Sequence, residues 1–151
     1  MKVSDPIALV LKSKETAGLL SVTPEQTVYE AITVMAKHNI GSLLVMSGDK
    51  LVGIFSERDY ARKCALLGHA SKDTQVHEIM TSPVFFVGPN HTVDDCMTMM
   101  TDRHIRHLPV LENDGRVLGI VSIGDLVKWV IRGQEDHIKT LEGYVSGGYM
   151  S

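Results

Sequence analysis

Two copies of one short pattern, a serine followed three residues later by an aspartate, carry the side chains best suited to chemistry: Ser56 with Asp59, and Ser122 with Asp125. A carboxylate only accepts hydrogen bonds, so it suits two neighbouring hydroxyl groups and repels a phosphate. A serine at a helix start stands beside free backbone N–H groups, which attract an anion. The same spacing also marks a helix start that needs no ligand. Ligand binding and helix capping therefore both remain open.

The other reactive side chains form no catalytic or metal-binding pattern. Cys64 and Cys96 have no CxxC partner and no cluster at zinc spacing, so we expect inert thiols. His104 and His107 are three residues apart without a third ligand nearby, so we expect no metal site. The sequence has no glycine-rich phosphate loop, no nucleophile beside a base and no pair of catalytic carboxylates. It therefore predicts a protein that is not an enzyme.

The composition narrows the class of partner. The chain has 151 residues, 44% hydrophobic and 22% charged, which is typical of a soluble globular protein. A formal charge of −3, without a stripe of Lys and Arg, argues against nucleic-acid binding. The N-terminal apolar run from Ile7 to Leu11 is too short for a signal peptide or a membrane span. We expect a cytoplasmic protein with no nucleic-acid and no membrane partner.

An internal repeat explains why the Ser-x-x-Asp pattern occurs twice. Residues 22–46 align with residues 87–111 at an offset of 65, and residues 51–65 align with residues 117–131 at an offset of 66. Thirteen identities keep this register. The sequence therefore predicts two copies of one supersecondary unit.

Each repeat is predicted to begin with a helix. In the first repeat, Thr27 followed by Glu30 is a capping-box signature, and an apolar stripe at helical spacing follows it. Thr92 with Asp95 repeats this signature in the second copy. Each of these helices should bury one face.

Two short apolar strands around a Gly/Asp turn follow each of these helices. The predicted strands are residues 42–46 and 51–55 in the first repeat, and residues 107–111 and 117–121 in the second. A second helix then begins directly after the serine of each Ser-x-x-Asp pattern.

Strands this apolar must be covered, and helices with one apolar stripe need a sheet to lie on. A repeat of about 60 residues would be marginally stable alone, so two repeats should share one core. We therefore predict an α+β fold of two β-α-β-β-α-like halves packed as a pseudo-twofold pair. The predicted boundaries are residues 1–67 for the first repeat, 68–80 for the linker, 81–132 for the second repeat and 133–151 for a C-terminal helical extension.

An apolar helical stripe continues past the second repeat, through Val130, Ile131, Ile138, Leu141 and Tyr144. It would leave apolar area that a monomer has to hide, and a second copy of the chain is a candidate cover. We therefore expect a homodimer.

The segments HNIGSLLVMSGDKLVGIFSERDYARK and RHIRHLPVLENDGRVLGIVSIGDLVKWV resemble two CBS domains. Together, over roughly residues 3–132, they are similar to the paired arrangement called a Bateman module and to stand-alone bacterial CBS-pair proteins. The resemblance implies a regulatory, ligand-sensing module of signal transduction that acts on a protein the sequence does not identify. It implies an adenosine nucleotide as ligand, AMP, ADP or ATP, with NAD and S-adenosylmethionine in the same class, and no metal.

The resemblance further implies two symmetry-related clefts between the repeats. In each cleft the aspartate accepts hydrogen bonds from the two ribose hydroxyls, while the serine faces the phosphate. The first, cleft A, is predicted to comprise Gly41, Ile54, Ser56, Arg58, Asp59, Val84, Phe85, Ile105, His107 and Pro109. Arg58 is its expected phosphate ligand, with His107 as a further donor, and the apolar members form a slot for adenine.

Cleft B should bind the phosphate differently. It is predicted to comprise Leu19, Leu20, Ile40, Ser42, Leu44, Arg106, Ile120, Ser122, Gly124 and Asp125. Gly124 stands where cleft A has Arg58, so the phosphate loses a cation there, and Arg106 is the candidate to compensate. We expect unequal clefts, with cleft A the stronger.

Two other functions remain open at this stage. One is a structural or oligomerisation module whose clefts stay empty. The other is a small enzyme acting on a nucleotide, which the missing catalytic motifs disfavour.

Overall fold

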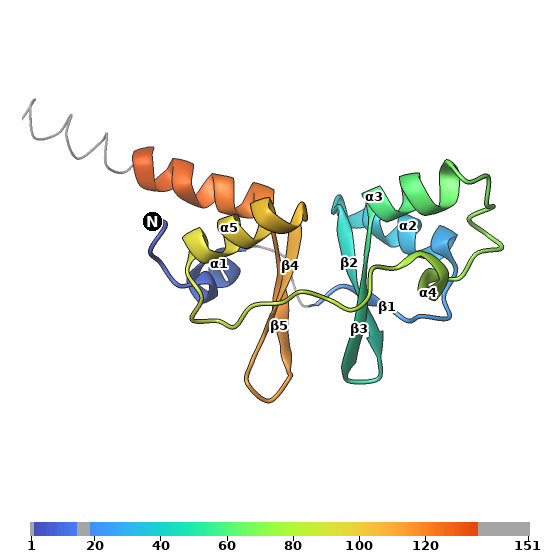
Figure 1. The fold of residues 1–151 in the computed structure, drawn as a ribbon, viewed down its shortest axis with the longest axis horizontal. Coiled ribbons are helices and arrows are strands. Elements are labelled where there is room, and N and C mark those ends of the chain that lie inside the picture. The colour runs from blue at the N-terminus through green and yellow to red at the C-terminus, as the bar shows by residue number, and fades with distance from the viewer. Residues whose placement is uncertain (1, 15–18, 136–151) are drawn as a thin grey trace, which may run out of the picture. The chain divides into compact units, whose positions relative to one another are not determined.

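The computed structural model describes residues 2–14 and 19–135, which are drawn in Figure 1. The chain forms two compact units: unit 1 comprises Met1–Glu15, Val87–Leu108 and Val121–Ser151, and unit 2 comprises Thr16–Phe86 and Pro109–Ile120. Of the predicted C-terminal extension, only residues 133–135 lie within the described residues, where they are helical. Helices and strands occur together in this chain, which confirms the predicted α+β class.

A three-stranded sheet organises unit 2. β1 (Ser21–Val22) pairs in parallel with β2 (Ser42–Ser47), and β2 pairs in antiparallel fashion with β3 (Lys50–Ser56). The two strands predicted in this repeat are thus confirmed, each extended by one residue or two. The first four residues of β2 are all buried, and three of them are apolar.

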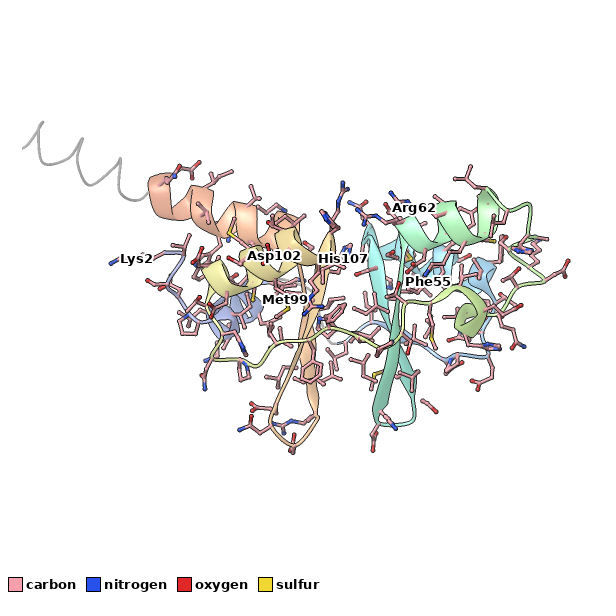
Figure 2. The ribbon with its side chains drawn as sticks, viewed as in Figure 1. Lys2, Phe55, Arg62, Met99, Asp102 and His107 are labelled. Carbon is pink, nitrogen blue, oxygen red and sulfur yellow. The ribbon has the colours of Figure 1, made fainter. Side chains whose placement is uncertain are left out.

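Helices cover one face of this sheet. Figure 1 shows α2 (Val28–His38) and α4 (Val76–Ile79) on the same side of the β2–β3 hairpin. Phe55 points from β3 toward these helices (Figure 2) and is fully buried in the core that they form with the sheet. Thr27 caps α2 by accepting the N–H of Glu30 at 3.1 Å, which is one half of the predicted capping box. The Glu30 carboxylate instead accepts a hydrogen bond from the Gln26 side chain at 3.0 Å.

The helix after β3 changes its hydrogen-bonding pattern. It begins as α3 (Glu57–Tyr60) and continues as η1 (Ala61–Ala65), a π-helix in which the Leu66 N–H donates to the Ala61 carbonyl at 3.0 Å. A π turn holds more residues than an α turn, so it rotates the following side chains away from the expected face. Leu67, in the turn that follows this π-helix, is 64% exposed.

Unit 1 contains three helices among its described residues. They are α1 (Ile7–Ser13), α5 (Val93–Arg103) and a helix over residues 123–135. Thr92 and Asp95 form the predicted capping box at the start of α5. The indole N–H of Trp129 donates to the Asp5 carboxylate at 3.1 Å, which ties the third helix to the N-terminal segment.

The second hairpin is formed by β4 (His107–Leu111) and β5 (Val117–Ser122), as predicted. Residues 109–120 of this hairpin belong to unit 2, and the two ends of the hairpin belong to unit 1. Val87, which aligns with Val22 of β1, is buried but lies outside the named strands.

The two segments that lead into the repeats are exchanged. The N–H of Ile7, which precedes the aligned part of the first repeat, donates to the His91 carbonyl of the second at 2.7 Å. The N–H of Val76, before the second repeat, donates to the Gln26 carbonyl of the first at 2.8 Å. Gln26 and His91 are 65 positions apart, so the two bonds are equivalent. The compact units therefore cut across the sequence-order boundaries predicted above.

Candidate functional site

The first Ser-x-x-Asp pattern lies where β3 passes into α3. The Ser56 hydroxyl oxygen accepts the Asp59 N–H at 3.1 Å, and the Asp59 Oδ2 accepts the Ser56 N–H at 3.0 Å. This reciprocal pair satisfies two N–H groups that the first turn of a helix leaves without intrahelical partners. Helix capping is thus confirmed for this pattern, and it holds the Asp59 carboxylate in one orientation.

The other carboxylate oxygen of Asp59 meets two further donors. The Thr81 hydroxyl donates to Oδ1 at 3.0 Å, and the Lys63 ammonium lies 3.0 Å from the same oxygen. Thr81 is held there because its backbone pairs with Ile54 of β3 through two hydrogen bonds of 3.0 and 2.8 Å. Asp59 is therefore only 6% exposed and has each oxygen engaged by its own set of donors.

The second pattern, where β5 passes into the helix 123–135, repeats the cap with a different cation. The Ser122 N–H donates to Asp125 Oδ2 at 2.8 Å, and the Asp125 N–H donates to the Ser122 hydroxyl at 3.1 Å. The ammonium of Lys14, from the end of α1, lies 2.9 Å from the same Oδ2. Desolvation alone would raise the pKa of Asp125, but the Ser122 N–H and Lys14 together hold that pKa below its usual value.

Backbone contacts fix the strand ends in the same way in both repeats. The Gly41 carbonyl accepts the N–H of Glu57 at 3.0 Å, and the Arg106 carbonyl accepts the N–H of Ile123 at 2.8 Å. Gly41 and Arg106 are 65 positions apart, so this bond is one more equivalent pair. Each Ser-x-x-Asp pattern therefore lies beside the residue that precedes the first strand of its hairpin, which is β2 in the first repeat and β4 in the second.

The predicted members of cleft A divide between the units. Unit 2 holds Gly41, Ile54, Ser56, Arg58, Asp59, Val84, Phe85 and Pro109, and unit 1 holds Ile105 and His107. Figure 2 labels His107, which begins β4. Ile54 is 8% exposed and Phe85 is 42% exposed. The structure brings Gly41, Ile54, Ser56 and Asp59 together around the end of β3, and the complete cleft stays a prediction.

Cleft B divides in the opposite sense. Unit 1 holds Arg106, Ser122, Gly124 and Asp125, which lie around the end of β5. Unit 2 holds Leu19, Leu20, Ile40, Ser42, Leu44 and Ile120. Leu44 is fully buried and Ser42 is 5% exposed. Assembly of these two sets into one cleft also stays a prediction.

The sequence did not lead us to predict three side chains that contact these two aspartates. Lys63 follows Asp59 at the helical i,i+4 spacing, which is a usable signal for an ion pair. Thr81 lies 65 positions after Thr16, so extending the repeat alignment toward the N-terminus would have singled it out. Lys14 is 111 positions from its partner Asp125, and no local pattern points to it.

Other candidate chemistry is weak in the described part of the chain. Burial raises the pKa of the Cys96 thiol to about 11, so this cysteine stays protonated at neutral pH. No group of three His, Cys, Asp or Glu residues suited to a metal ion occurs among residues 2–14 and 19–135. Within the same ranges, no helix combines the length and the apolar character needed to cross a membrane.

An apolar pocket of about 150 Å³ lies between α2 and α3, next to the first pattern but apart from its aspartate. Its lining includes Met35, Ile40 and Tyr60, and neither Ser56 nor Asp59. Sites for ligands of drug size usually enclose roughly 300–1,000 Å³. This pocket is too small to hold a nucleotide.

Comparison with known proteins assigns this chain to a family. The CBS domain family matches residues 15–65 and 76–132. A mitochondrial CBS domain-containing protein of Arabidopsis thaliana, CBSX3, is 40% identical over 154 residues, which span 97% of this chain and 74% of that protein.

Solved structures that resemble this chain also contain CBS domains. A protein with CBS domains from Burkholderia ambifaria MC40-6, provisionally assigned to signal transduction, has a TM-score of 0.82 at 48% identity, covering 86% of this chain and 96% of that chain. A CBS domain pair in complex with 5′-methylthioadenosine and S-adenosyl-L-methionine has a TM-score of 0.73 at 27% identity, covering 86% of this chain and 98% of that chain. The chain therefore belongs to the CBS domain family and carries two CBS repeats.

Proposed function

We propose that this CBS pair is a regulatory module that binds an adenosine nucleotide at the two Ser-x-x-Asp patterns and catalyses no reaction. The observation that carries the proposal is the fixed carboxylate of Asp59. Its Oδ2 is held by the helix cap, while its Oδ1 faces the hydroxyl of Thr81 and the ammonium of Lys63. One oxygen thus positions the group, and the other is placed among donors.

A ribose fits such a carboxylate. Its two neighbouring hydroxyls are donors, and a carboxylate offers acceptors only, so a ribose can take the place of the donors that now surround Asp59 Oδ1. Hydrogen bonds to a charged group are worth about 1.5–3 kcal/mol each, more than those between neutral groups. Capping and ribose binding are therefore compatible at one aspartate, because each uses a different oxygen.

The phosphate of the nucleotide belongs at the helix start. Ser122 precedes a helix that runs over residues 123–135, and Ser56 precedes α3, so both serines stand beside N–H groups at a helix N-terminus. In the first repeat Arg58 and Lys63 follow Ser56 on the same helical segment. An anion bound there would meet two cations as well as backbone donors.

The adenosine class is supported by a relative. The two ligands of the 27% identical CBS pair, 5′-methylthioadenosine and S-adenosyl-L-methionine, share an adenosine group. AMP, ADP, ATP and NAD carry the same group with phosphates added, and the cations beside Ser56 favour a phosphorylated member. A ligand that stabilises one arrangement of the module would pass its signal to a partner protein.

Thermal unfolding with AMP and GMP tests this proposal. A ligand at about 100 times its dissociation constant adds roughly 2.7 kcal/mol to folding, so AMP should raise Tm, with saturation. GMP should raise Tm less. Equal shifts with all nucleobases would show that adenine is not recognised, and no shift with any nucleotide would favour a purely structural module.

A further inference from the structure

Two segments lead into the repeats: the first lead-in runs from Ile7 to Pro24, and the second runs from Val76 to Pro89. They differ in length, although they make equivalent contacts. Ile7 and Val76 donate to equivalent carbonyls, and the next proline of the repeat alignment is Pro24 after Ile7 and Pro89 after Val76. Seventeen positions separate the first pair and thirteen separate the second, so the first lead-in is four residues longer. Lys14 lies in this longer segment, directly after α1.

Lys14 makes an ion pair within unit 1. Its ammonium lies 2.9 Å from Asp125 Oδ2, and the two side chains are 25% and 19% exposed. The Lys14 backbone is held at the end of α1, where its N–H donates to the Leu11 carbonyl. Its four-carbon side chain thus starts from a fixed point and carries a compact charge with three donors.

The second repeat has lost the cations that the first repeat carries on its helix. At the positions equivalent to Arg58 and Lys63, which follow at an offset of 66, the second repeat has Gly124 and Trp129. Trp129 is 7% exposed and donates to Asp5, so it serves the packing of unit 1. Lys14 is the cation that the structure places at Asp125 instead.

We propose that Lys14 selects phosphorylated ligands at Asp125: when the ribose hydroxyls take the carboxylate, the Lys14 ammonium passes to the phosphate of the nucleotide. This inference rests on the function proposed above and deepens it. Lys14 contacts Oδ2, the oxygen that also accepts the cap N–H, so a ribose that binds the other carboxylate oxygen leaves the ammonium in place. A nucleoside offers that ammonium no partner, whereas a nucleotide brings a phosphate to it. The Asp125 site therefore discriminates against nucleosides, and Lys14 is the residue responsible.

The ratio of the adenosine and AMP dissociation constants tests this role. Isothermal titration is carried out on the full chain with Asp59→Asn, which leaves the Asp125 site to be read alone. Added Lys14→Met should weaken AMP binding at least about tenfold, since a hydrogen bond to a charged group is lost. It should leave adenosine binding equal or tighter, because Asp125 is no longer paired. The selectivity ratio should collapse by about tenfold or more.

Two further variants serve as controls. Lys12→Met removes the same charge from an exposed position two residues earlier on α1, and should keep the ratio unchanged. Lys14→Arg keeps the charge and should restore most of the preference for AMP. Melting temperatures of all variants without ligand show whether each is folded.

The outcomes separate the two proposals. An unchanged ratio in Lys14→Met, or an equal fall in Lys12→Met, overturns the role of Lys14 and leaves the proposed function standing. If neither the wild type nor the Asp59→Asn chain binds AMP or adenosine, the proposed function fails, and the assignment of Lys14 fails with it.

Discussion

Asp59 and Asp125 each combine a structural task, the capping of a helix, with an ion pair to a lysine. Both accept an N–H from the serine that starts the helix, which orients the carboxylate. Asp95 occupies the same position in the α5 cap, but no lysine of residues 2–14 and 19–135 forms an ion pair with it. The lysine beside each Ser-x-x-Asp pattern thus distinguishes these two aspartates from one that only caps.

Acid should weaken the fold partly through Asp125. The pKa of Asp125 is lower in the folded chain than its usual value, so the stability that it contributes is present above about pH 4 and is lost as pH falls toward the folded pKa. Asp125→Asn should remove this contribution. Urea unfolding of both proteins should show a difference in the free energy of unfolding at pH 6 that shrinks between about pH 4.5 and pH 3.

Asp102→Asn is a suitable control, because it changes an exposed carboxylate of α5 in the same way. A difference between wild type and Asp125→Asn that stays constant over this pH range would contradict the assigned role of the Asp125 charge.

At the scale of elements, β3 depends on a close approach at Gly53. A Cβ added there would come within 2.5 Å of the Met80 sulfur and 3.2 Å of the Thr81 carbonyl oxygen. The methionine can give way, but the Thr81 backbone is paired to β3 and cannot move without losing its bonds. Gly53→Ala should therefore lower the free energy of unfolding by about 1–3 kcal/mol in urea denaturation.

Gly124→Ala makes the same change where there is room. The nearest atom to an added Cβ there is the Ser122 hydroxyl oxygen at 3.6 Å, an ordinary contact. This variant should be neutral or gain up to about 1 kcal/mol, since alanine favours a helix more than glycine does. Equal losses in both variants would show that the approach of Met80 and Thr81 to β3 is not what requires glycine.

The elements that the sequence predicts well are those with local causes. The helix start at Thr92 needs only Asp95 three residues later, and the strands need only short apolar runs between turns. The π-helix after Tyr60 and the exchange of the lead-in segments have no local signature. They depend on contacts between residues far apart in the chain, and so does the pairing of Lys14 with Asp125.

At the scale of the whole molecule, the exchange ties each repeat to a segment outside it. Ile7 is fully buried in the described structure, and so is its counterpart Val76. A change at Ile7 should therefore act on the second repeat, and a change at Val76 should act on the first. Through Lys14, the same arrangement gives the first lead-in a contact with Asp125 of the second repeat.

The homodimer expected from the sequence stays a prediction. Of the apolar stripe assigned to it, Val130 is half-buried and Ile131 is 47% exposed on the helix 123–135. Ile138, Leu141 and Tyr144 lie outside the described residues. The exposed part of the stripe supports the expectation, and a second copy of the chain remains the proposed cover.

Isothermal titration of AMP into Asp59→Asn, Asp125→Asn and the double variant tests the central claim most directly. Each single change should abolish or weaken at least about tenfold the binding at its own aspartate and leave the other site intact, and the double variant should bind no AMP. Asp95→Asn, which alters a helix cap alone, should cost about 1 kcal/mol of stability or less and keep wild-type affinity. Wild-type stoichiometry and affinity in the double variant would contradict the account and leave helix capping as the whole role of both aspartates.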